Sequence, residues 1–335
     1  MRLIPTSLQT TSRPRLACAI TDEAIYAGHS VSAAAPLLAT AWHPVSPGAI
    51  TPARTAPIFS GNSLASGNSL AEELQNLKAL QQVAGKSRSK QVTLVVPDIC
   101  VRVLVLDFES LPVKASEALP LVRFRLRKML PFDVDTAAVS YQVLKKNQEV
   151  EKVGSLRVLV AAVQAELREE LEALVRGAGF EPGAILPATL AALAAVPEDG
   201  AHLLVHTGLQ SVTTAITQAG DLLLYRTVER TVPVNAASAD PYAPREFASP
   251  AQGDDLAQAI LMAAAYYEDT LGRTPDHVLV AGSETPESLS AQLNAVCDWQ
   301  IPLRSLVRTE HFLAEAMPSG QAACGFAGVV GALHG

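Results

Sequence analysis

The sequence predicts an α/β protein built from two similar lobes, and three observations support this fold class. Residues 16–29 and residues 203–226 each contain strand-like runs joined by short turns, which is typical of a β-hairpin. Each hairpin is followed by helices and strands in alternation, as in α/β sheets. The length of 335 residues is sufficient for two domains. We therefore expect a duplicated fold with a cleft between the lobes.

Strands and helices of the first half are expected from apolar spacing and from breaker residues. Leucines at 70, 74, 77 and 80 recur at helical spacing behind Ser69, a residue type that caps helices. Pro131 ends the amphipathic helix expected at 116–130. The other expected elements are strands at 16–20, 25–29, 37–42, 91–96, 100–106, 140–144 and 157–163, and helices at 166–177 and 185–196.

The second half is organised around residues 202–226, in which two short turns separate three strand-like runs. The first turn begins at His206, Thr207 and Gly208. Pro, Ala and Ser are frequent in residues 233–253, and this composition indicates a loop, as does the polar character of residues 145–154. We expect helices from 254 or 255 to 271, at 288–297 and at 322–333, and a strand at 277–281.

Composition excludes several classes of protein. The 26 basic and 33 acidic residues give a net charge of −7, which argues against bulk attraction of the whole chain to nucleic acid or to an anionic membrane. The four cysteines are far apart and have no metal-ligand spacing, so we expect reduced thiols and no metal site. No apolar stretch reaches the ~18 residues of a membrane helix, and no secretory signal opens the chain. We expect a soluble, intracellular protein.

Three turns rich in small residues follow expected strands and are candidate ligand loops. Backbone N–H groups in such turns can face a phosphate, and ligands of α/β sheets usually bind at strand ends. The candidate residues in these turns are Thr21, Asp22, Thr207, Gly208, Ser211, Gly282 and Ser283.

A group of cations lies in the helix expected at 116–130, including Arg123, Arg127 and Lys128. Such a group can dock an acidic partner. It can equally be a solvated helix face whose positive charge near the C-terminal end is favourable. The sequence alone leaves both interpretations open.

Five stretches, taken in order and spacing, resemble the PilM family of type IV pilus assembly proteins, within the actin-like ATPase superfamily. The resemblance covers about residues 15–335 and implies an actin-like (ribonuclease H-like) two-lobe fold with an inserted small α+β subdomain. It divides the chain into a tail (1–14), a first lobe (15–90), the insertion (91–182), and a second lobe (183–335) whose last helix returns to the first lobe. The stretches are SPGAI at 46–50, VVPD at 95–98, RKMLPFDVDTAAVSYQVL at 127–144, YYEDTLGRTPDHVLVAGS at 266–283 and AACGFAGVVGAL at 322–333.

The resemblance implies a cytoplasmic scaffold of the inner-membrane platform, with a role in pilus biogenesis and twitching motility. Its partners would be the cytoplasmic N-terminal peptide of a PilN-like membrane protein and other platform or motor components, with no nucleic acid and no direct membrane insertion. The peptide would bind in a groove between the first lobe and the inserted subdomain. The related GspL family of type II secretion continues into a membrane helix, which this sequence lacks, so we favour PilM.

The sequence departs from the superfamily at two positions. Actin-like ATPases place an aspartate in each phosphate loop, where it holds hydrated Mg²⁺, but these positions are Cys18 and His206 here. We therefore predict a degenerate cleft with no catalytic residues. The one cofactor that the resemblance implies is ATP with Mg²⁺. The three turns are the candidate contacts of this cofactor. Two alternatives stay open: an active actin-like ATPase or sugar kinase relative that uses Asp22 or Glu23, and a module that senses a small metabolite.

Overall fold

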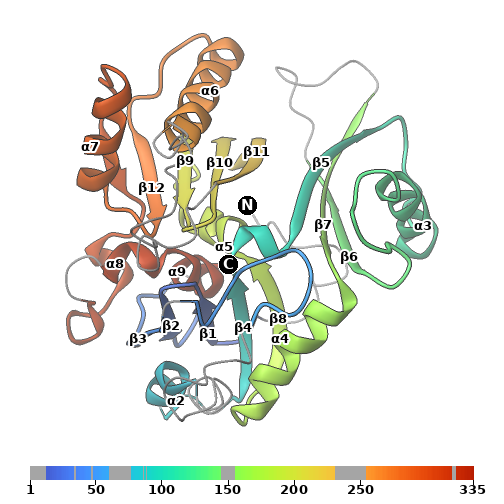
Figure 1. The fold of residues 1–335 in the computed structure, drawn as a ribbon, viewed down its shortest axis with the longest axis vertical. Coiled ribbons are helices and arrows are strands. Elements are labelled where there is room, and N and C mark those ends of the chain that lie inside the picture. Colours follow the sequence, from blue (N-terminus) through green and yellow to red (C-terminus); the bar gives the residue numbers. More distant parts are fainter. Residues whose placement is uncertain are drawn as a thin grey trace, which may run out of the picture.

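Two five-stranded sheets with the same strand order form the centre of the molecule, as the computed structural model shows (Figure 1). The first sheet has the order β3-β2-β1-β4-β8 and the second has the order β11-β10-β9-β12-β13. This repetition confirms the predicted duplicated α/β fold. The structure describes residues 13–33, 35–46, 48–59, 77–85, 87, 89–144, 155–230, 254–318 and 322–335.

The first sheet begins with an antiparallel hairpin of β1 and β2, and β4 and β8 extend it in parallel with β1. Every residue of β1 and β2 is buried, because α2 covers one face of this sheet and α9 the other. The elements of this lobe are β1 Leu16–Ile20, β2 Ala24–His29, β3 Ala39–Pro44, α2 Lys78–Ala84, β4 Gln91–Val96 and β8 Glu181–Pro187.

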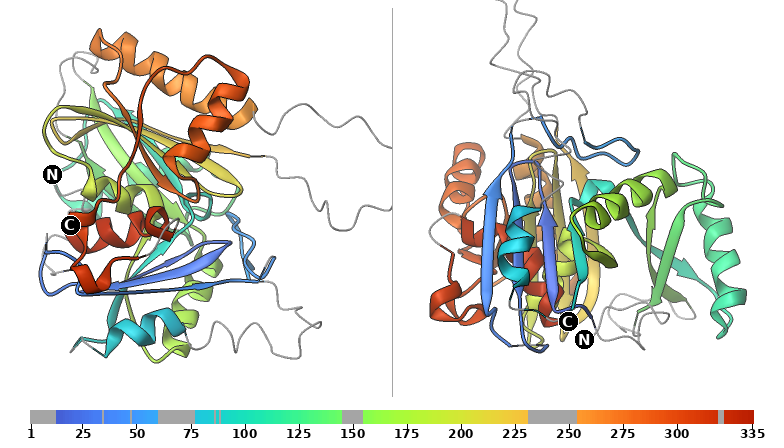
Figure 2. Two further views of the ribbon diagram at one scale, coloured as in Figure 1. Left: turned by 90° about the vertical axis from the view of Figure 1, so that its left-hand side faces the viewer. Right: turned by 90° about the horizontal axis from the view of Figure 1, so that it is seen from below.

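The second sheet repeats this plan, with β9, β10 and β11 as its antiparallel part and β12 and β13 parallel to β9. Helices α6 and α7 cover its outer face, where Tyr267 is fully buried (Figure 2). The elements are β9 Ala201–Thr207, β10 Ser211–Gln218, β11 Asp221–Glu229, α6 Asp254–Leu271, β12 Val278–Gly282, α7 Pro286–Val296, β13 Leu303–Ser305, η4 Thr309–His311 and η5 Ala314–Ala316.

A small subdomain is inserted between β4 and β8, at the place where the second lobe has only α7 between β12 and β13. Its three-stranded antiparallel sheet has the order β5-β7-β6, and α3 packs on the outer face of that sheet through Val122 and Leu126. The elements are η2 Asp98–Cys100, β5 Arg102–Phe108, α3 Ala115–Leu126, β6 Ala138–Val143, β7 Leu156–Val163 and α4 Ala165–Gly177.

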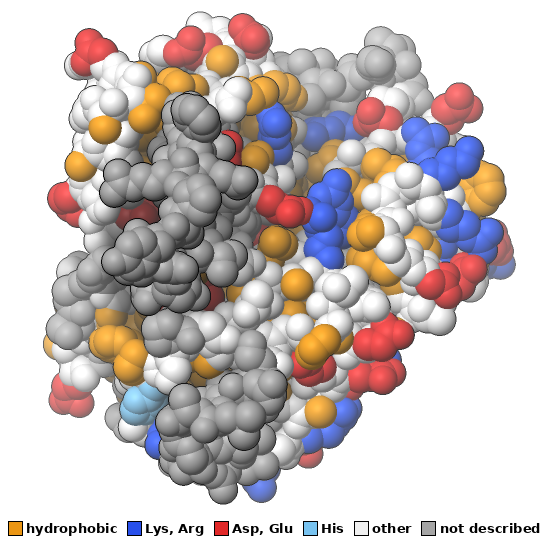
Figure 3. Space-filling view, viewed as in Figure 1, with side chains coloured by type: hydrophobic (Ala, Val, Ile, Leu, Met, Phe, Trp, Pro, Cys, Tyr) orange, Lys and Arg blue, Asp and Glu red, His pale blue; other side chains and the backbone are white. Residues whose placement is uncertain are grey.

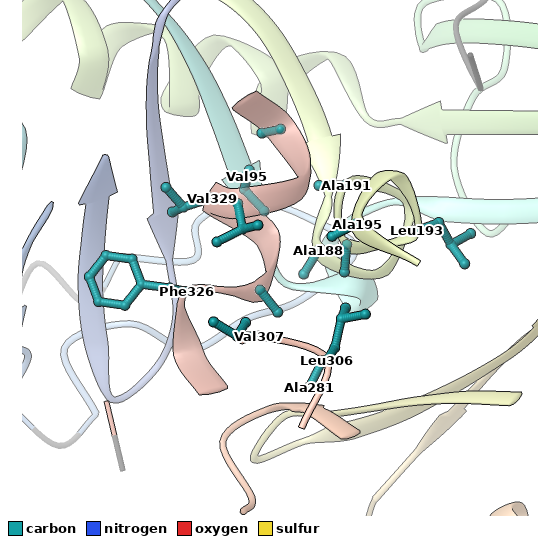
Figure 4. Close-up of a cluster of buried hydrophobic side chains, with 14 of the residues drawn as sticks. Val95, Ala188, Ala191, Leu193, Ala195, Ala281, Leu306, Val307, Phe326 and Val329 are labelled. Carbon is teal, nitrogen blue, oxygen red and sulfur yellow. The ribbon is translucent and has the colours of Figure 1, made fainter. Parts of the chain in front are cut away.

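The core between the lobes is formed by the C-terminal helix and the helix that follows β8 (Figure 4). Gly331 allows the two helices to pack closely, since a Cβ at this position would lie 1.9 Å from the Ala191 carbonyl oxygen. Val329 and Phe326 add apolar contacts toward the first sheet. The elements are α5 Ala188–Ala192, η3 Leu193–Ala195, α8 Ala322–Gly325 and α9 Ala327–His334.

Two strands were not expected from the sequence. β8 ends at Pro187, after which the expected helix begins, and it was missed because a short apolar run beside prolines has no periodicity that separates strand from helix. Strand β13 was not expected, since three residues are too few to give a pattern. Ser69, Leu70, Leu74 and the two predicted loops at 145–154 and 233–253 lie outside the described residues.

Candidate functional site

All seven candidate residues of the three turns line one cavity between the lobes. The cavity has a volume of only about 50 Å³. This volume is small beside the ~300–1,000 Å³ of usual ligand pockets. The seven residues therefore converge on one small cavity between the lobes. Nucleotide binding at these residues stays a prediction.

Asp98 occupies the centre of this interface, directly after β4 of the first lobe. Its carboxylate is 4% exposed and accepts hydrogen bonds from the Thr189 backbone N–H (3.0 Å), the Thr189 hydroxyl (2.6 Å) and the Tyr225 hydroxyl (2.9 Å). His206 Nδ1 lies 3.6 Å from Asp98 Oδ2. Because Tyr225 and His206 belong to the second lobe, a single buried carboxylate connects both lobes to α5. We call these four residues the interlobe network.

Burial decides the charge states within the interlobe network. Burial lowers the pKa of His206, and the Asp98 carboxylate opposes this effect only in part. Burial also raises the pKa of the Tyr225 hydroxyl well above its usual value, and the charge of Asp98 raises it further. His206 is therefore neutral and Tyr225 is a protonated donor near pH 7. Sequence reasoning missed Asp98, although a carboxylate at the end of a buried parallel strand is a signal for a site.

The second and third turns are joined to each other by their own hydrogen bonds. The Ser283 backbone N–H donates to the Thr207 carbonyl oxygen (2.9 Å), and the Glu284 N–H donates to the Thr207 hydroxyl (3.0 Å). Gly282 has a φ of +96°, and a Cβ there would lie 1.9 Å from the same Thr207 oxygen. The Gly208 N–H donates to the Ser211 carbonyl oxygen (2.8 Å). These amides are thus engaged within the protein and do not face an open phosphate site.

The first turn is closed in the same way. The Thr21 backbone N–H and hydroxyl both donate to the Ala24 carbonyl oxygen (3.0 and 2.7 Å), and the Thr21 hydroxyl accepts from the Ala24 N–H (2.9 Å). Cys18 lies in the core between the first sheet and α2, where burial raises its pKa to about 12. It does not line the cleft, and it offers no thiolate to a metal.

Acidic side chains still gather beside the cleft. Burial raises the pKa of Asp22, and burial together with the charges of Asp22 and Glu284 raises that of Glu23. The Asp22 Oδ2 atom is shielded from solvent and has no hydrogen-bond partner among the described residues. However, the described part of the chain contains no group of three His, Cys, Asp or Glu side chains arranged to hold a metal.

A larger groove lies between the first lobe and the inserted subdomain, with a volume of about 290 Å³. Its floor is the inner face of the small sheet, including Ser140 and Ala161, and its sides are β8 and α4. β8 is an edge strand, and no described strand pairs with its outer edge. An open edge beside an apolar floor is the arrangement with which proteins bind an extended peptide.

The predicted partner-binding cations have separate positions. The Arg123 guanidinium donates to the carbonyl oxygens of Val134 and Ala137, so it fixes α3 to the segment that follows it. One terminal nitrogen of Arg127 donates to both carboxylate oxygens of Asp135, at 2.9 Å for each. Lys128 is exposed. Of the three, therefore, only Lys128 is directed to solvent without a role in bracing the helix.

Solved structures with a similar fold include pilus and secretion proteins. A chain of the PilM-PilN type IV pilus biogenesis complex is 18% identical with a TM-score of 0.66, covering 96% of this chain and 98% of that chain. The cytoplasmic domain of EpsL, an inner-membrane component of the Vibrio cholerae type II secretion system, is 13% identical with a TM-score of 0.43, covering 85% and 95%. A Bacteroides thetaiotaomicron protein of unknown function with an actin-like ATPase fold is 12% identical with a TM-score of 0.43, covering 87% and 89%.

No protein-family model matches the sequence, and a search of curated proteins finds no match. Among the described residues, no helix combines the length and the apolar character needed to span a bilayer. Over nearly its whole length, the chain therefore shares the fold of that chain of the PilM-PilN complex.

Proposed function

We propose that this protein is a scaffold of the type IV pilus assembly platform at the inner membrane, and that it binds the cytoplasmic peptide of a PilN-like membrane protein. One observation carries the proposal: a groove of about 290 Å³ lies beside β8, an edge strand with which no second described strand pairs on its outer side. The fold of the PilM-PilN complex chain supports the choice of partner. The protein would be held at the membrane through such partners.

The peptide is expected to lie in the groove as an extended strand. Backbone groups on the open edge of β8 would pair with it, and apolar side chains of the peptide would enter the space above Ala161 and Ser140. The guanidinium of Arg168 and the carboxylate of Glu172, both on α4, line the same groove and can orient charged groups of the peptide.

Calorimetric titration with a synthetic peptide of the partner's cytoplasmic segment tests this proposal. Ala161→Trp fills the groove from its floor and should weaken peptide binding at least tenfold. Ala265→Trp, on the exposed surface of α6, is the matched control and should leave the affinity unchanged. Equal binding by wild type and Ala161→Trp would remove the groove as the binding site.

We further propose that the cleft does not turn over ATP. Two observations support the absence of ATP turnover. The turn amides already donate to carbonyl oxygens of Thr207, Ser211 and Ala24. The two positions at which actin-like ATPases have an aspartate are Cys18 and His206. Purified protein should release no phosphate from ATP with Mg²⁺. Release that is abolished in Asp22→Asn would instead favour the active ATPase with a displaced metal.

A further inference from the structure

The outer face of α3 carries large apolar side chains that the subdomain does not cover. Phe124 is 70% exposed, Leu121 is 46% exposed and Met129 is 42% exposed, while Val113 just before the helix is fully exposed. Leu121 and Phe124 are three residues apart and therefore share one side of the helix, opposite the buried Val122 and Leu126. Exposed apolar side chains that gather in this way usually mark an interaction surface.

Basic side chains surround these apolar ones. Lys114, Arg125 and Lys128 are all exposed, and Figure 3 shows basic and hydrophobic side chains interspersed over α3. The acid on this face, Glu117, lies 3.6 Å from Lys114. Residues 113–129 contain five cations and one acid, a formal charge of +4 in a chain whose net charge is −7, and one of the five cations, Arg127, is paired with Asp135. We call this region, formed by residues 113–129, the α3 face.

The α3 face lies on the outside of the small subdomain. Arg123 and Arg127 bond to the segment that follows the helix, and the Arg127–Asp135 pair is itself exposed. α3 lies on the outer face of the small sheet, at the periphery of the molecule (Figures 1 and 2).

From this arrangement we infer that the α3 face contacts the surface of a bilayer rich in anionic lipid. The apolar tips would enter the boundary between headgroups and acyl chains, and the cations would lie among the anionic headgroups, as in interfacial amphipathic helices. The negative charge of the whole chain does not oppose this contact, because salt screens exposed charges. At physiological salt, the interaction of each surface charge reaches only about 8–10 Å. This contact is additional to the peptide groove. It would orient the scaffold on the membrane to which the partner is anchored. This orienting role rests on the proposed function.

Vesicle sedimentation with the purified full chain and no partner tests the inference. The probes are vesicles of phosphatidylcholine alone and of equal parts phosphatidylcholine and phosphatidylglycerol, in 0.1 M and 0.5 M salt. We expect at least about fivefold more protein on the anionic vesicles than on the neutral ones, because one or two cations near an anionic surface give a factor of this size. This excess should be lost in high salt, which screens the cations.

Two variants locate the contact. Phe124→Ser and Lys128→Glu should each lower the fraction bound to anionic vesicles about fivefold or more, since one removes an apolar tip and the other reverses a charge. Both positions are exposed, so unchanged circular dichroism and thermal midpoints are expected. The matched controls are Leu313→Ser and Lys78→Glu, which change exposed residues elsewhere and should bind vesicles as the wild type does.

Three outcomes would overturn the inference. They are equal binding of the wild type to neutral and anionic vesicles, retention of anionic-vesicle binding by both α3 variants, and a shift of self-association in Phe124→Ser measured by sedimentation velocity. The last result would make the α3 face a contact between two copies of the chain. Peptide affinity measured on the same variants should stay at the wild-type value, so failure here is distinguishable from failure of the groove.

Discussion

The cleft between the lobes and the groove beside the inserted subdomain both lie at the margins of the first sheet, but their polar groups are used differently. The cleft has a volume of about 50 Å³, and the groove has about 290 Å³. In the cleft, the turn amides bond to carbonyl oxygens within their own lobe, and the Asp98 carboxylate accepts a hydrogen bond from Tyr225 of the second lobe. In the groove, the edge of β8 has no strand partner among the described residues.

This difference teaches where binding is to be expected in the fold. Buried polar groups that already have partners stabilise one arrangement of the lobes, and a ligand would have to replace those bonds. An open strand edge instead gains hydrogen bonds when a peptide binds. The second lobe also has a hollow beside its edge strand β13, lined by α7 and α8, but only α7 stands between β12 and β13. The insertion therefore gives the groove of the first lobe a wall of three strands that the second lobe does not have at the matching place.

The largest expected effect comes from Gly282→Ala, which tests how tightly the second and third turns are joined. The added Cβ would lie 1.9 Å from the Thr207 carbonyl oxygen, and the φ of +96° is unfavourable for alanine. We expect a loss of more than ~3 kcal/mol in the free energy of unfolding, from strain and from separation of β9 and β12. Gly272→Ala is a milder control, because its φ is also positive but no atom lies within 4 Å of its Cβ position. A smaller loss in Gly282→Ala than in Gly272→Ala would contradict the close contact.

Asp98→Ala tests the interlobe network and has the next largest expected effect. The substitution leaves the Tyr225 hydroxyl and two Thr189 donors buried without an acceptor. We expect a loss of about 3 kcal/mol in urea denaturation, and faster amide exchange in α5. Asp269→Ala, on the exposed side of α6, should change stability by less than about 0.5 kcal/mol. If both variants were equally stable, the network would not hold the lobes together.

Thr207→Val separates the role of the hydroxyl from that of the backbone in the second turn. The hydroxyl donates to the Ala281 carbonyl oxygen (3.2 Å) and accepts from the Glu284 N–H, and valine keeps the shape but loses both bonds. A loss of about 1–2 kcal/mol is expected in thermal or urea unfolding. The matched control is Thr217→Val, since the buried Thr217 hydroxyl has no hydrogen-bond partner among the described residues. That variant should be neutral or more stable.

Sequence reasoning was most successful where local pattern decides the structure. The hairpins that open each lobe and strand β4 have runs of apolar residues bounded by turns, and they formed as predicted, with ends shifted by no more than a few residues. Duplication could be inferred because the same pattern occurs twice. Strand β8 could not be recognised, since its identity depends on pairing with β4, about 90 residues away in sequence.

The content of the cleft was harder to predict than its position. The seven turn residues meet at one cavity, but their spacing says nothing of how near the lobes approach. Asp98 was not singled out, because its partners Thr189 and Tyr225 are 91 and 127 residues away. In the same way, Arg123 and Arg127 looked like a free charged face, and only the structure shows that Asp135 and two carbonyl oxygens engage them.

The smallest expected effect is a pH dependence that arises in the cleft. Burial lowers the pKa of His206 below its value of 6.5 in the unfolded chain, so the unfolded state binds more protons once the pH falls through that value. The stability present above pH 6.5 is therefore lost on acidification, at no more than about 1.4 kcal/mol per pH unit for one group. His206→Asn should show a shallower decline between pH 7 and pH 5 when urea midpoints are compared. Some decline will stay, because burial and His334 lower the pKa of His311 to about 4. A variant with the full wild-type slope would place the proton uptake outside the cleft.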